Sequence, residues 1–348
     1  MQVVVLAGGM GTRLRPWTWS TPKPALPMLD RTLIEQVVGT FGETIVEEVI
    51  LAGGYMIEEL RTIMGYRDLP FRLTIAEEHQ PLGTGGALRN CKEHIRGPFV
   101  CFNGDIISSL DPSKLLEAMT RHGGIGALGL WTVKDPSRFG IVHTEGEIIT
   151  GFSEKPHPRE LLEKFRTTGG YLINAGSYAF QPTIFDHLPD GPHSLERHVF
   201  PRLASDGALS GVPFDGRFID AGVPSAWLDA TAACIADGRF VRGTRIETSW
   251  FESDAHDGVE SSAIHAGVSI GARAIVERSY VLEDVSIGRD SIVRNSLIGA
   301  GARIGSRCIL NGVTVGYGAS IPDDTTLQGD LESPVAWPPG SEKMRPVE

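Results

Sequence analysis

The alternation of apolar and polar positions divides the chain into two kinds of sequence. Up to about residue 240, short apolar runs alternate with segments in which apolar residues recur at helical spacing. Residues 3–6 predict a buried strand, residues 33–41 a helix, and residues 48–52 a second strand. Strands that alternate with helices predict a doubly wound, mostly parallel α/β sheet, whose ligands bind beyond the carboxyl ends of the strands.

From about residue 258 the apolar residues recur six positions apart, with two steps of five. The positions are Ile264, Ile270, Val276, Leu282, Ile287, Val293, Ile298, Ile304 and Leu310. Such a period, with glycines in the turns, is typical of a short parallel β-helix whose coils each contain three short strands. The pattern therefore predicts an α/β domain at 1–240, a hexapeptide-repeat domain at 241–330 and an extended, proline-rich tail at 331–348.

The stretch after the first strand carries glycines and then cations. Glycines let backbone N–H groups approach a ligand closely because they lack a Cβ, and the cations suit the oxygens of a polyphosphate. They are Gly8, Gly9 and Gly11, followed by Arg13, Arg15 and Lys23. The stretch lacks the third glycine of the dinucleotide motif and lacks a P-loop motif, and a structural turn would not need the cations. It therefore predicts a site for a nucleoside triphosphate.

The longer string L-A-G-G-x-G-T-R-L-x-P, followed by P-K-P, resembles the signature of the sugar-1-phosphate nucleotidyltransferases, also called NDP-sugar pyrophosphorylases. Later segments are similar to further motifs of that family: PLGTGGA, NGD, RFGIV, EKP, NAG and FIDAGVPSAW. In the last segment, Phe218 and Ala221 replace the commoner Trp and Ile. The resemblance extends over nearly the whole chain and is strongest to the mannose-1-phosphate guanylyltransferase type. It implies a Rossmann-like catalytic domain followed by a left-handed β-helix.

The resemblance also implies a role for each motif residue. The leaving pyrophosphate would be stabilised by the catalytic residues Arg13 and Lys23, which leaves Arg15 as a solvated charge. The nucleotide would be bound by Leu6, Ala7, Gly8, Gly9, Gly11, Thr12, Glu78, Pro81, Gly83 and Thr84. The sugar phosphate would be bound by Gly140, Glu154, Lys155 and Asn174. The cofactor Mg²⁺ would be bound by Asp105 and Asp220.

Physical chemistry supports the metal assignment of Asp105. This aspartate follows an apolar run at residues 98–102, which predicts another buried strand. A carboxylate at the carboxyl end of a central strand is well placed to hold Mg²⁺, a cation that takes oxygen ligands and bridges phosphates. The alternative is that Asp105 only caps a turn.

Glu78 lies where the resemblance places the residue that reads the nucleobase, a position at which uridylyl, thymidylyl and adenylyl members usually carry Gln. A carboxylate only accepts hydrogen bonds. Its two oxygens match the adjacent N1–H and N2 amine donors of guanine, whereas uracil and thymine offer one donor between two acceptors. Glu78 therefore favours GTP. The alternative is a solvated surface charge, since Glu77 adjoins it.

Charge and cysteine content narrow the class of protein. The net charge of −11 argues against a nucleic-acid partner, which would require a basic footprint. The four cysteines are scattered without a C-x-x-C pair, which favours a reducing compartment over a disulfide framework or a zinc site. The first strand begins at once, with no leader before it, and no apolar run approaches the length of a membrane span. We therefore expect a cytoplasmic protein with no membrane partner.

Together these features predict an enzyme that transfers GMP from GTP to a sugar 1-phosphate, such as mannose 1-phosphate, and releases pyrophosphate. Uridylyl, thymidylyl or adenylyl transfer, to glucose 1-phosphate or a cyclitol phosphate, stays open, as does a regulatory homologue without turnover. Acetyl transfer by the β-helix would need a longer coil with a histidine base, and His265 lies at the very start of the repeats. We therefore expect the β-helix to join the subunits of a homo-oligomer.

Overall fold

The computed structural model describes residues 1–39, 46–155, 165–167, 169–239, 249–250, 258–329 and 334–341. The chain forms two compact units, each of which combines segments that are distant in sequence. Unit 1 consists of Met1–Gly9 and Val37–Phe218, and unit 2 consists of Met10–Gln36 and Ile219–Glu348. The domain boundaries at residues 240 and 330 follow changes in sequence pattern, and they stay predictions.

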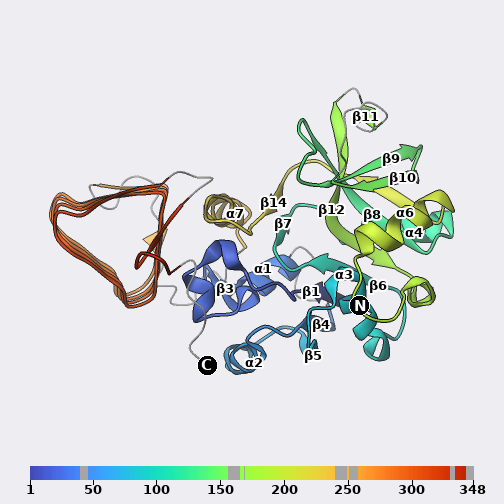
Figure 1. Ribbon diagram of the computed structural model, residues 1–348, viewed down its shortest axis with the longest axis horizontal. Coiled ribbons are helices and arrows are strands. Elements are labelled where there is room, and N and C mark those ends of the chain that lie inside the picture. Colours follow the sequence, from blue (N-terminus) through green and yellow to red (C-terminus); the bar gives the residue numbers. More distant parts are fainter. Residues whose placement is uncertain are drawn as a thin grey trace. The chain divides into compact units, whose positions relative to one another are not determined.

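Unit 1 is built on a ten-stranded sheet with the order β5-β4-β1-β6-β12-β8-β13-β10-β9, in which β11 pairs with β12 (Figure 1). The strands are β1 (Gln2–Leu6), β4 (Glu48–Gly53), β5 (Arg72–Glu77), β6 (Phe99–Asn103), β8 (Gly126–Val133), β9 (Gly140–Glu145), β10 (Ile148–Glu154), β11 (Arg166–Thr167), β12 (Gly170–Phe180) and β13 (Leu209–Pro213). The first four strands of the order run parallel, as predicted. β12 is antiparallel to both β6 and β8, so the remainder of the sheet is mixed.

Two helical segments of unit 1 begin with the caps that the sequence predicts. Asp111 accepts a hydrogen bond from the backbone N–H of Ser113 at the start of α4 (Pro112–His122). Ser194 does the same for Arg197, where a π-helical turn leads into α6 (Phe200–Ser205). Such caps satisfy backbone donors that have no partner within the helix. The unit also contains α2 (Ile57–Gly65), the strand β7 (Ile106–Ser108), 3-10 turns at Lys92–His94 and Pro182–His187, and the π-helical turn at Leu195–Val199.

One helix boundary differs from the prediction. The three glycines of the PLGTGGA segment predict a turn, with a helix only from residue 88, whereas α3 spans Gly83–Asn90 and so includes the glycines. The backbone N–H groups of Gly85 and Gly86 donate to the carbonyl oxygen of His193, at 2.9 and 3.3 Å. This external acceptor satisfies donors in the first turn, which allows a glycine-rich segment to start a helix.

Unit 2 contains a parallel β-helix, which Figure 1 shows in orange and red as a stack of three-sided coils. Its ladders are β15-β17-β20-β23-β26-β29, β16-β19-β22-β25-β28 and β18-β21-β24-β27, and their pairs are parallel except that β15 is antiparallel to β17. The strands are β15 (Ser249–Trp250), β16 (Val259–Glu260), β17 (Ala263–Ile264), β18 (Ser269–Ile270), β19 (Ile275–Glu277), β20 (Tyr280–Val281), β21 (Ser286–Ile287), β22 (Ile292–Arg294), β23 (Leu297–Ile298), β24 (Arg303–Ile304), β25 (Ile309–Asn311), β26 (Val313–Val315), β27 (Ser320–Ile321), β28 (Thr326–Gln328) and β29 (Val335–Trp337).

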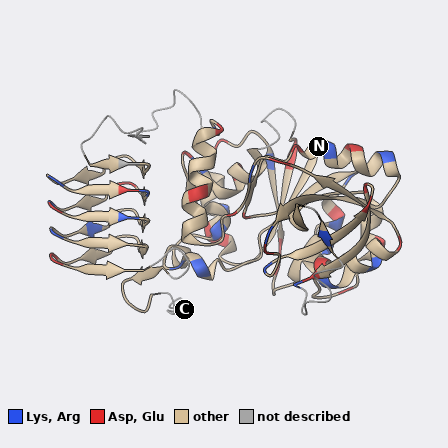
Figure 2. Cartoon of the chain, turned by 90° about the horizontal axis from the view of Figure 1, so that it is seen from above, with Lys and Arg blue, Asp and Glu red and all other residues tan. Residues whose placement is uncertain are grey.

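The register of the coils explains the irregular repeat. Ala263 pairs with Tyr280, which pairs with Leu297. Partners in adjacent coils are 17 residues apart, as are Arg273 and Asp290, whose side chains bond at 2.6 Å. A coil of that length contains two steps of six residues and one of five, so Ile264 stacks on Val281 and Val281 on Ile298, and the repeat position predicted at Leu282 belongs to Val281. Charged positions recur along the edges of the stacked coils (Figure 2).

The rest of unit 2 comprises short elements from Met10–Gln36, which lies between the two segments of unit 1, and from the start of the segment that follows unit 1. They are 3-10 turns at Thr12–Leu14, Trp17–Trp19 and Lys23–Ala25, the strands β2 (Pro27–Met28), β3 (Arg31–Thr32) and β14 (Phe218–Asp220), and the helices α1 (Leu33–Val38) and α7 (Pro224–Ala236). The first residue of β14 and the last two residues of α1 belong to unit 1. Thr32 and Glu35 form a capping box at α1, in which the Thr32 N–H donates to Glu35 Oε2 at 2.8 Å. β29 pairs with β26, so part of the proline-rich tail continues the coil.

Candidate functional site

The glycine loop leaves the carboxyl edge of the parallel strands. The backbone N–H of Ala7 donates to the carbonyl oxygen of Ala52 (2.7 Å), and that of Gly104 donates to Leu6 (2.9 Å). These bonds hold the end of β1 between the ends of β4 and β6. The next residues of the chain, Gly8 and its neighbour Gly9, are exposed beyond that edge.

Glu78 follows β5 directly, and it is buried, with 8% of its surface exposed. Its Oε2 accepts a hydrogen bond from the backbone N–H of Leu82 at 3.2 Å. Its Oε1 is buried, and among the described residues no group donates to it. Burial raises the pKa of Glu78, against the effect of the Leu82 N–H. A Cβ on Gly8 would lie 3.0 Å from Oε1, so the unused oxygen adjoins the glycine loop.

The PLGTGGA segment is fixed by Thr84. Its hydroxyl donates to Oε2 of Glu196 at 2.6 Å and accepts from the backbone N–H of Leu195 at 2.9 Å. Ser194 donates to the same oxygen of Glu196 at 2.6 Å. The Thr84 hydroxyl therefore joins α3 to the π-helical turn. The other predicted nucleotide-binding residues of the segment, Pro81 and Gly83, are exposed.

The NGD motif lies at the end of β6, whose last residue is Asn103. Asp105 follows it and is half-buried. The Oδ1 of Asn103 is buried, and within the described part of the chain no donor reaches it. Because Gly104 bonds to the end of β1, the motif lies beside the start of the glycine loop. The carboxyl edge therefore brings together Glu78, Asn103 and Asp105, and the first two each have a buried oxygen that accepts no hydrogen bond from the described residues.

The predicted sugar-binding residues lie on the antiparallel part of the sheet. Gly140 pairs with Glu154 across β9 and β10, and a Cβ on Gly140 would lie 2.7 Å from Oε2 of Glu154. Burial and the nearby Glu196 raise the pKa of this carboxyl, while Lys155 and Arg197 lower it. The Nζ of Lys155 is 3.8 Å from Oε1 of Glu154, and the lysine side chain is 56% exposed. The proline of the EKP motif lies outside the described residues.

Asn174 lies in β12 and is half-buried. Its Oδ1 accepts from the backbone N–H of Gly176 at 3.0 Å, and its Nδ2 donates to the hydroxyl of Tyr178 at 2.9 Å. These bonds span an irregularity in the β8–β12 register between the same residues. The amide has a second N–H, which is the donor that a sugar hydroxyl could use.

Unit 2 carries the rest of the signature stretch. Gly11 has a φ of +61°, and a Cβ there would lie 2.8 Å from Cγ2 of Thr18 and 3.1 Å from Cβ of Lys23. Only glycine fits this turn without strain. The Thr18 hydroxyl donates to the carbonyl oxygen of Gly11 at 2.9 Å. Thr12 and Arg13 are exposed, and Lys23 is half-buried.

Arg13 and Asp220 are neighbours within unit 2. A Cβ on Gly222 would lie 2.5 Å from Nη2 of Arg13 and 2.7 Å from Oδ1 of Asp220. That oxygen also accepts from the backbone N–H of Gly222 at 3.0 Å. The expectation that Arg15 is a solvated charge is wrong: the side chain is half-buried, and its Cζ stacks 3.7 Å from the ring centroid of Trp19 in a cation–π contact.

Within the described ranges, no group of three or more His, Cys, Asp or Glu side chains is arranged to hold a metal ion. Mg²⁺ does not need such a group, because it is usually held by one or two carboxylates together with water and substrate phosphates. Asp105 and Asp220 are both half-buried carboxylates, so the donor chemistry fits Mg²⁺. Metal binding itself stays a prediction.

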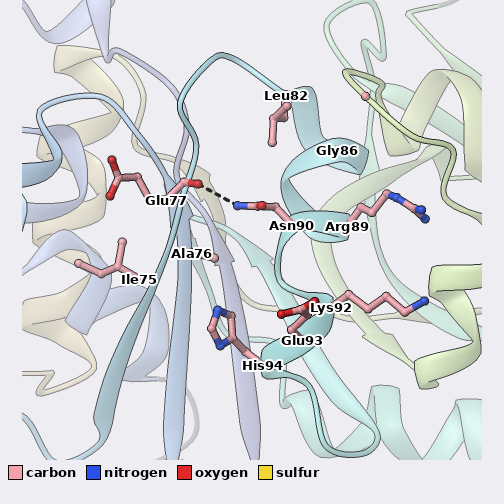
Figure 3. Close-up of a pocket in the computed structure, with 11 residues that line it drawn as sticks. Ile75, Ala76, Glu77, Leu82, Gly86, Arg89, Asn90, Lys92, Glu93 and His94 are labelled. Atoms are coloured by element: carbon pink, nitrogen blue, oxygen red, sulfur yellow. Dashed lines mark hydrogen bonds between the residues drawn. The ribbon is translucent and has the colours of Figure 1, made fainter.

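A cavity of about 550 Å³ is lined by the end of β5, by Leu82 and by α3 (Figure 3). Its lining residues are Ile75, Ala76, Glu77, Leu82, Gly86, Arg89, Asn90, Lys92, Glu93, His94 and Gly191. Asn90 donates to the carbonyl oxygen of Glu77 at 3.0 Å, and Arg89 donates to Leu188 at 2.7 Å and pairs with Asp190 at 2.5 Å. These polar groups hold α3 in place. The residues that line the cavity include none of the predicted site residues.

Two residues of the site were not predicted from the sequence. Glu196 accepts a hydrogen bond from Thr84, which is 112 positions away in the sequence. In the sequence, a Glu that follows a capping Ser indicates only the start of a helix. Asn103 belongs to the NGD motif, yet only the aspartate of that motif was assigned a role. The signal that could have revealed Asn103 is its position as the last residue of a buried strand.

The fold and these residues define the class of protein. A family model described as nucleotidyl transferase matches residues 2–236, and one described as GMPPB C-terminal domain matches residues 255–334. The chain therefore belongs to the nucleotidyl transferase family, as the sequence predicted.

The particular proteins that the chain resembles agree with this class. It is 34% identical over 234 residues to a probable mannose-1-phosphate guanylyltransferase 2 of Oryza sativa subsp. japonica, which covers 66% of this chain and 63% of that protein. It is 33% identical over 235 residues to the mannose-1-phosphate guanylyltransferase catalytic subunit beta of Dictyostelium discoideum, with the same two coverages. Each match thus spans less than two thirds of the relative.

Solved structures give a third comparison. HddC from Yersinia pseudotuberculosis, in a crystal structure complexed with GMP-PN, has a TM-score of 0.54 and 25% sequence identity. That match covers 67% of this chain and 98% of HddC.

Among the helices that the structure describes, none combines the length and apolar character needed to span a membrane.

Proposed function

We propose that this protein is a sugar-1-phosphate guanylyltransferase, which transfers GMP from GTP to a sugar 1-phosphate of the mannose 1-phosphate kind. The observation that carries the choice of GTP is the buried carboxylate of Glu78, whose Oε1 adjoins Gly8 and has no donor among the described residues. The N1–H and N2 amine of guanine are two adjacent donors that a carboxylate can accept. The names of the relatives and the GMP-PN ligand of HddC support the same base.

In the proposed reaction, an oxygen of the sugar 1-phosphate attacks the α-phosphorus of GTP, and the bond from that phosphorus to the bridging oxygen breaks. The products are GDP-sugar and pyrophosphate. Arg13 and Lys23 stabilise the negative charge of the leaving pyrophosphate, and Lys155 holds the attacking phosphate. Positioning and charge neutralisation supply most of the rate in such transfers, so no side-chain nucleophile is required.

Mg²⁺ would be held by Asp105 and Asp220 together with phosphate oxygens. When bound, it would neutralise phosphate charge and so reduce the repulsion between the two substrates. The guanidinium of Arg13 lies beside Asp220 at Gly222. For the sugar, Glu154 and the second amide N–H of Asn174 would bind hydroxyl groups, and the backbone N–H of Gly140 would add a donor.

The test is pyrophosphate release by the full chain with a matrix of nucleoside triphosphates and sugar 1-phosphates, with and without EDTA. We expect the highest kcat/KM with GTP and mannose 1-phosphate and no turnover in EDTA. A preference for UTP, dTTP or ATP would overturn the choice of guanine. Absence of turnover with every pair would favour a regulatory homologue.

We also propose a cytoplasmic location and a homo-oligomer joined through the β-helix. The four free cysteines, Cys91, Cys101, Cys234 and Cys308, are all buried, which suits a compartment that keeps thiols reduced. Light scattering on the full chain tests the oligomer, and a monomer at micromolar concentration would contradict it. Fractionation of cells tests the location.

A further inference from the structure

The signature stretch is anchored to the β-helix within unit 2. Trp17 is completely buried, and its indole N–H donates to the carbonyl oxygen of Val315, the last residue of β26, at 2.9 Å. Its ring packs against Trp227 of α7 and against Tyr280 and Tyr317 of the coil, with centroids 6.3, 6.1 and 6.0 Å away. We call these four side chains the aromatic dock. Aromatic pairs at such distances contribute beyond their buried area.

A second anchor lies at the other end of the stretch. The hydroxyl of Tyr280 donates to the carbonyl oxygen of Pro27 at 3.1 Å and accepts from the backbone N–H of Leu29 at 2.8 Å. It also lies 2.9 Å from Nε2 of His265. Burial lowers the pKa of this histidine to about 4, so the ring is neutral at pH 7.

The predicted phosphate-binding cations lie on the stretch that these anchors hold. Lys23 lies between the two anchors in sequence, and Arg13 precedes the first of them. Within the stretch, Gly11 lies against the side chains of Thr18 and Lys23, so the turn that precedes Arg13 packs directly beside Lys23. Trp19 adds a third link, since its indole N–H donates to the carbonyl oxygen of Ser341, beyond β29.

We propose that the β-helix positions Arg13 and Lys23 for triphosphate binding, with Tyr280 as the positioning residue. This proposal rests on the proposed function and adds a role for the coil besides subunit contact. The buried His265 then serves to hold the Tyr280 hydroxyl, rather than to act as a base for acetyl transfer. A catalytic cation that is displaced by a fraction of an ångström loses transition-state stabilisation, because the gain from orientation depends on geometry.

The variant that tests the proposal is Tyr280→Phe, which keeps the ring in the aromatic dock and removes the hydroxyl that three groups share. We expect the KM for GTP to rise and kcat to fall, each by about fivefold, whereas the KM for the sugar 1-phosphate stays within about twofold. Hydrogen–deuterium exchange of the backbone at residues 10–36 should become faster in the same variant.

The matched control is Val293→Ala. Val293 is completely buried in the core of the coil and lies on β22, in a ladder that contains none of the dock residues. This variant should lower the melting temperature while both KM values and exchange at residues 10–36 stay as in the wild type. If it changed the KM for GTP as Tyr280→Phe does, the effect would be general destabilisation and the proposal would be wrong.

Unchanged kinetics and unchanged exchange in Tyr280→Phe would also overturn the positioning role. The exchange measurement needs no turnover, so it separates this proposal from the proposed function. If the wild type released no pyrophosphate with any substrate pair, faster exchange in Tyr280→Phe would still support the anchoring, and unchanged exchange would refute it.

Discussion

Glu48 and Glu78 are both buried carboxylates of unit 1. They lie at opposite edges of the parallel part of the sheet, at the ends of the adjacent strands β4 and β5. Glu48 is the first residue of β4 and is 4% exposed, whereas Glu78 follows the last residue of β5 and is 8% exposed. Their burial is therefore almost the same. The difference between them lies in their partners.

Glu48 is saturated by donors from several segments. Gln2 and Thr74 donate to it at 2.8 Å each, and Arg96 and Arg72 pair with it at 2.7 and 3.0 Å. Burial raises the pKa of Glu48, but the bonds from Thr74, Arg72 and Gln2 outweigh it and lower the pKa to about 2. At the amino edge of the sheet, a buried charge thus serves stability.

Glu78 has one backbone donor and an oxygen without a partner in the described part of the chain, and burial raises its pKa. Asn103, at the same edge, also has a buried oxygen without a donor among the described residues. A buried polar atom without a partner costs free energy, which a fold tolerates where a ligand supplies the missing group. The contrast indicates that the carboxyl edge is built for a ligand and the amino edge for the fold.

The largest effect should come from the carboxyl edge. We expect Asp105→Ala to lower the rate of pyrophosphate release by about a hundredfold or more, because charge that develops in the transition state loses its stabilisation. The melting temperature should stay near that of the wild type, since Asp105 is only half-buried. Asp105→Asn separates charge from packing and should be equally inactive. Wild-type activity in either variant would exclude Asp105 as a metal ligand.

A smaller effect is expected for Glu78→Gln. Loss of a charge-assisted hydrogen bond should lower kcat/KM for GTP by about tenfold to a hundredfold, and kcat/KM for UTP should change much less, because an amide offers one donor and one acceptor. Glu77→Gln is the control, since that neighbour pairs with Arg61 at 2.6 Å. An unchanged nucleotide profile in Glu78→Gln would remove the argument for guanine and would weaken the contrast between the two edges.

Much of the fold follows from local sequence. An apolar run at residues 126–133 predicts a strand and Pro224 predicts a helix start, and β8 (Gly126–Val133) and α7 (Pro224–Ala236) have these bounds. The period of about six residues predicted the coil, whereas its register gave a different residue at one position, because steps of six, six and five place Val281 rather than Leu282 in the repeat. The site assignments came from motif resemblance, and they stay predictions until they are tested.

Other features could not be predicted because their parts are distant in sequence. The partners of Glu48 come from three other segments, and Thr84 bonds to a residue 112 positions away. The packing of Trp17 on Val315 joins residues 298 positions apart. No local pattern marks such pairs, because each partner alone has an ordinary role as a strand, cap or core residue.

Glu48→Gln tests the amino edge. We expect the free energy of unfolding at pH 7 to fall by about 1–3 kcal/mol, because the charge-assisted bonds to Arg72 and Arg96 are lost while both arginines remain largely exposed. Catalytic parameters should not change. Since the folded pKa of Glu48 is about 2, below its ordinary value of 4.5, the wild type loses this stability as pH falls from 4.5 toward 2.

Urea titrations at several pH values measure the free energy of unfolding. In the Glu48→Gln variant, this free energy should lack the decrease that Glu48 causes in the wild type between pH 4.5 and pH 2. Its control is Glu47→Gln, because Glu47 is 77% exposed and its ion pair with the N-terminal amine, at 3.2 Å, is screened by solvent. The control should change stability by no more than about 0.5 kcal/mol. Equal losses in both variants would show that the buried network at the amino edge has no special role.

The smallest effect is the pH dependence of nucleotide choice in the wild type. Burial raises the pKa of Glu78 above its ordinary 4.5, so as pH falls this carboxyl takes up its proton before an exposed glutamate would. The KM for GTP should therefore rise at a pH where Glu48 is still ionised and the fold is still fully stable. A protonated carboxyl offers one donor and one acceptor, as an amide does, so the KM for UTP should stay level or fall over the same range. KM values for both nucleotides across this range, with melting temperatures at each pH, test the prediction. If the KM values for GTP and UTP rose in parallel, protonation of the phosphates or loss of the fold would explain the change. Glu78 would then not titrate separately from Glu48.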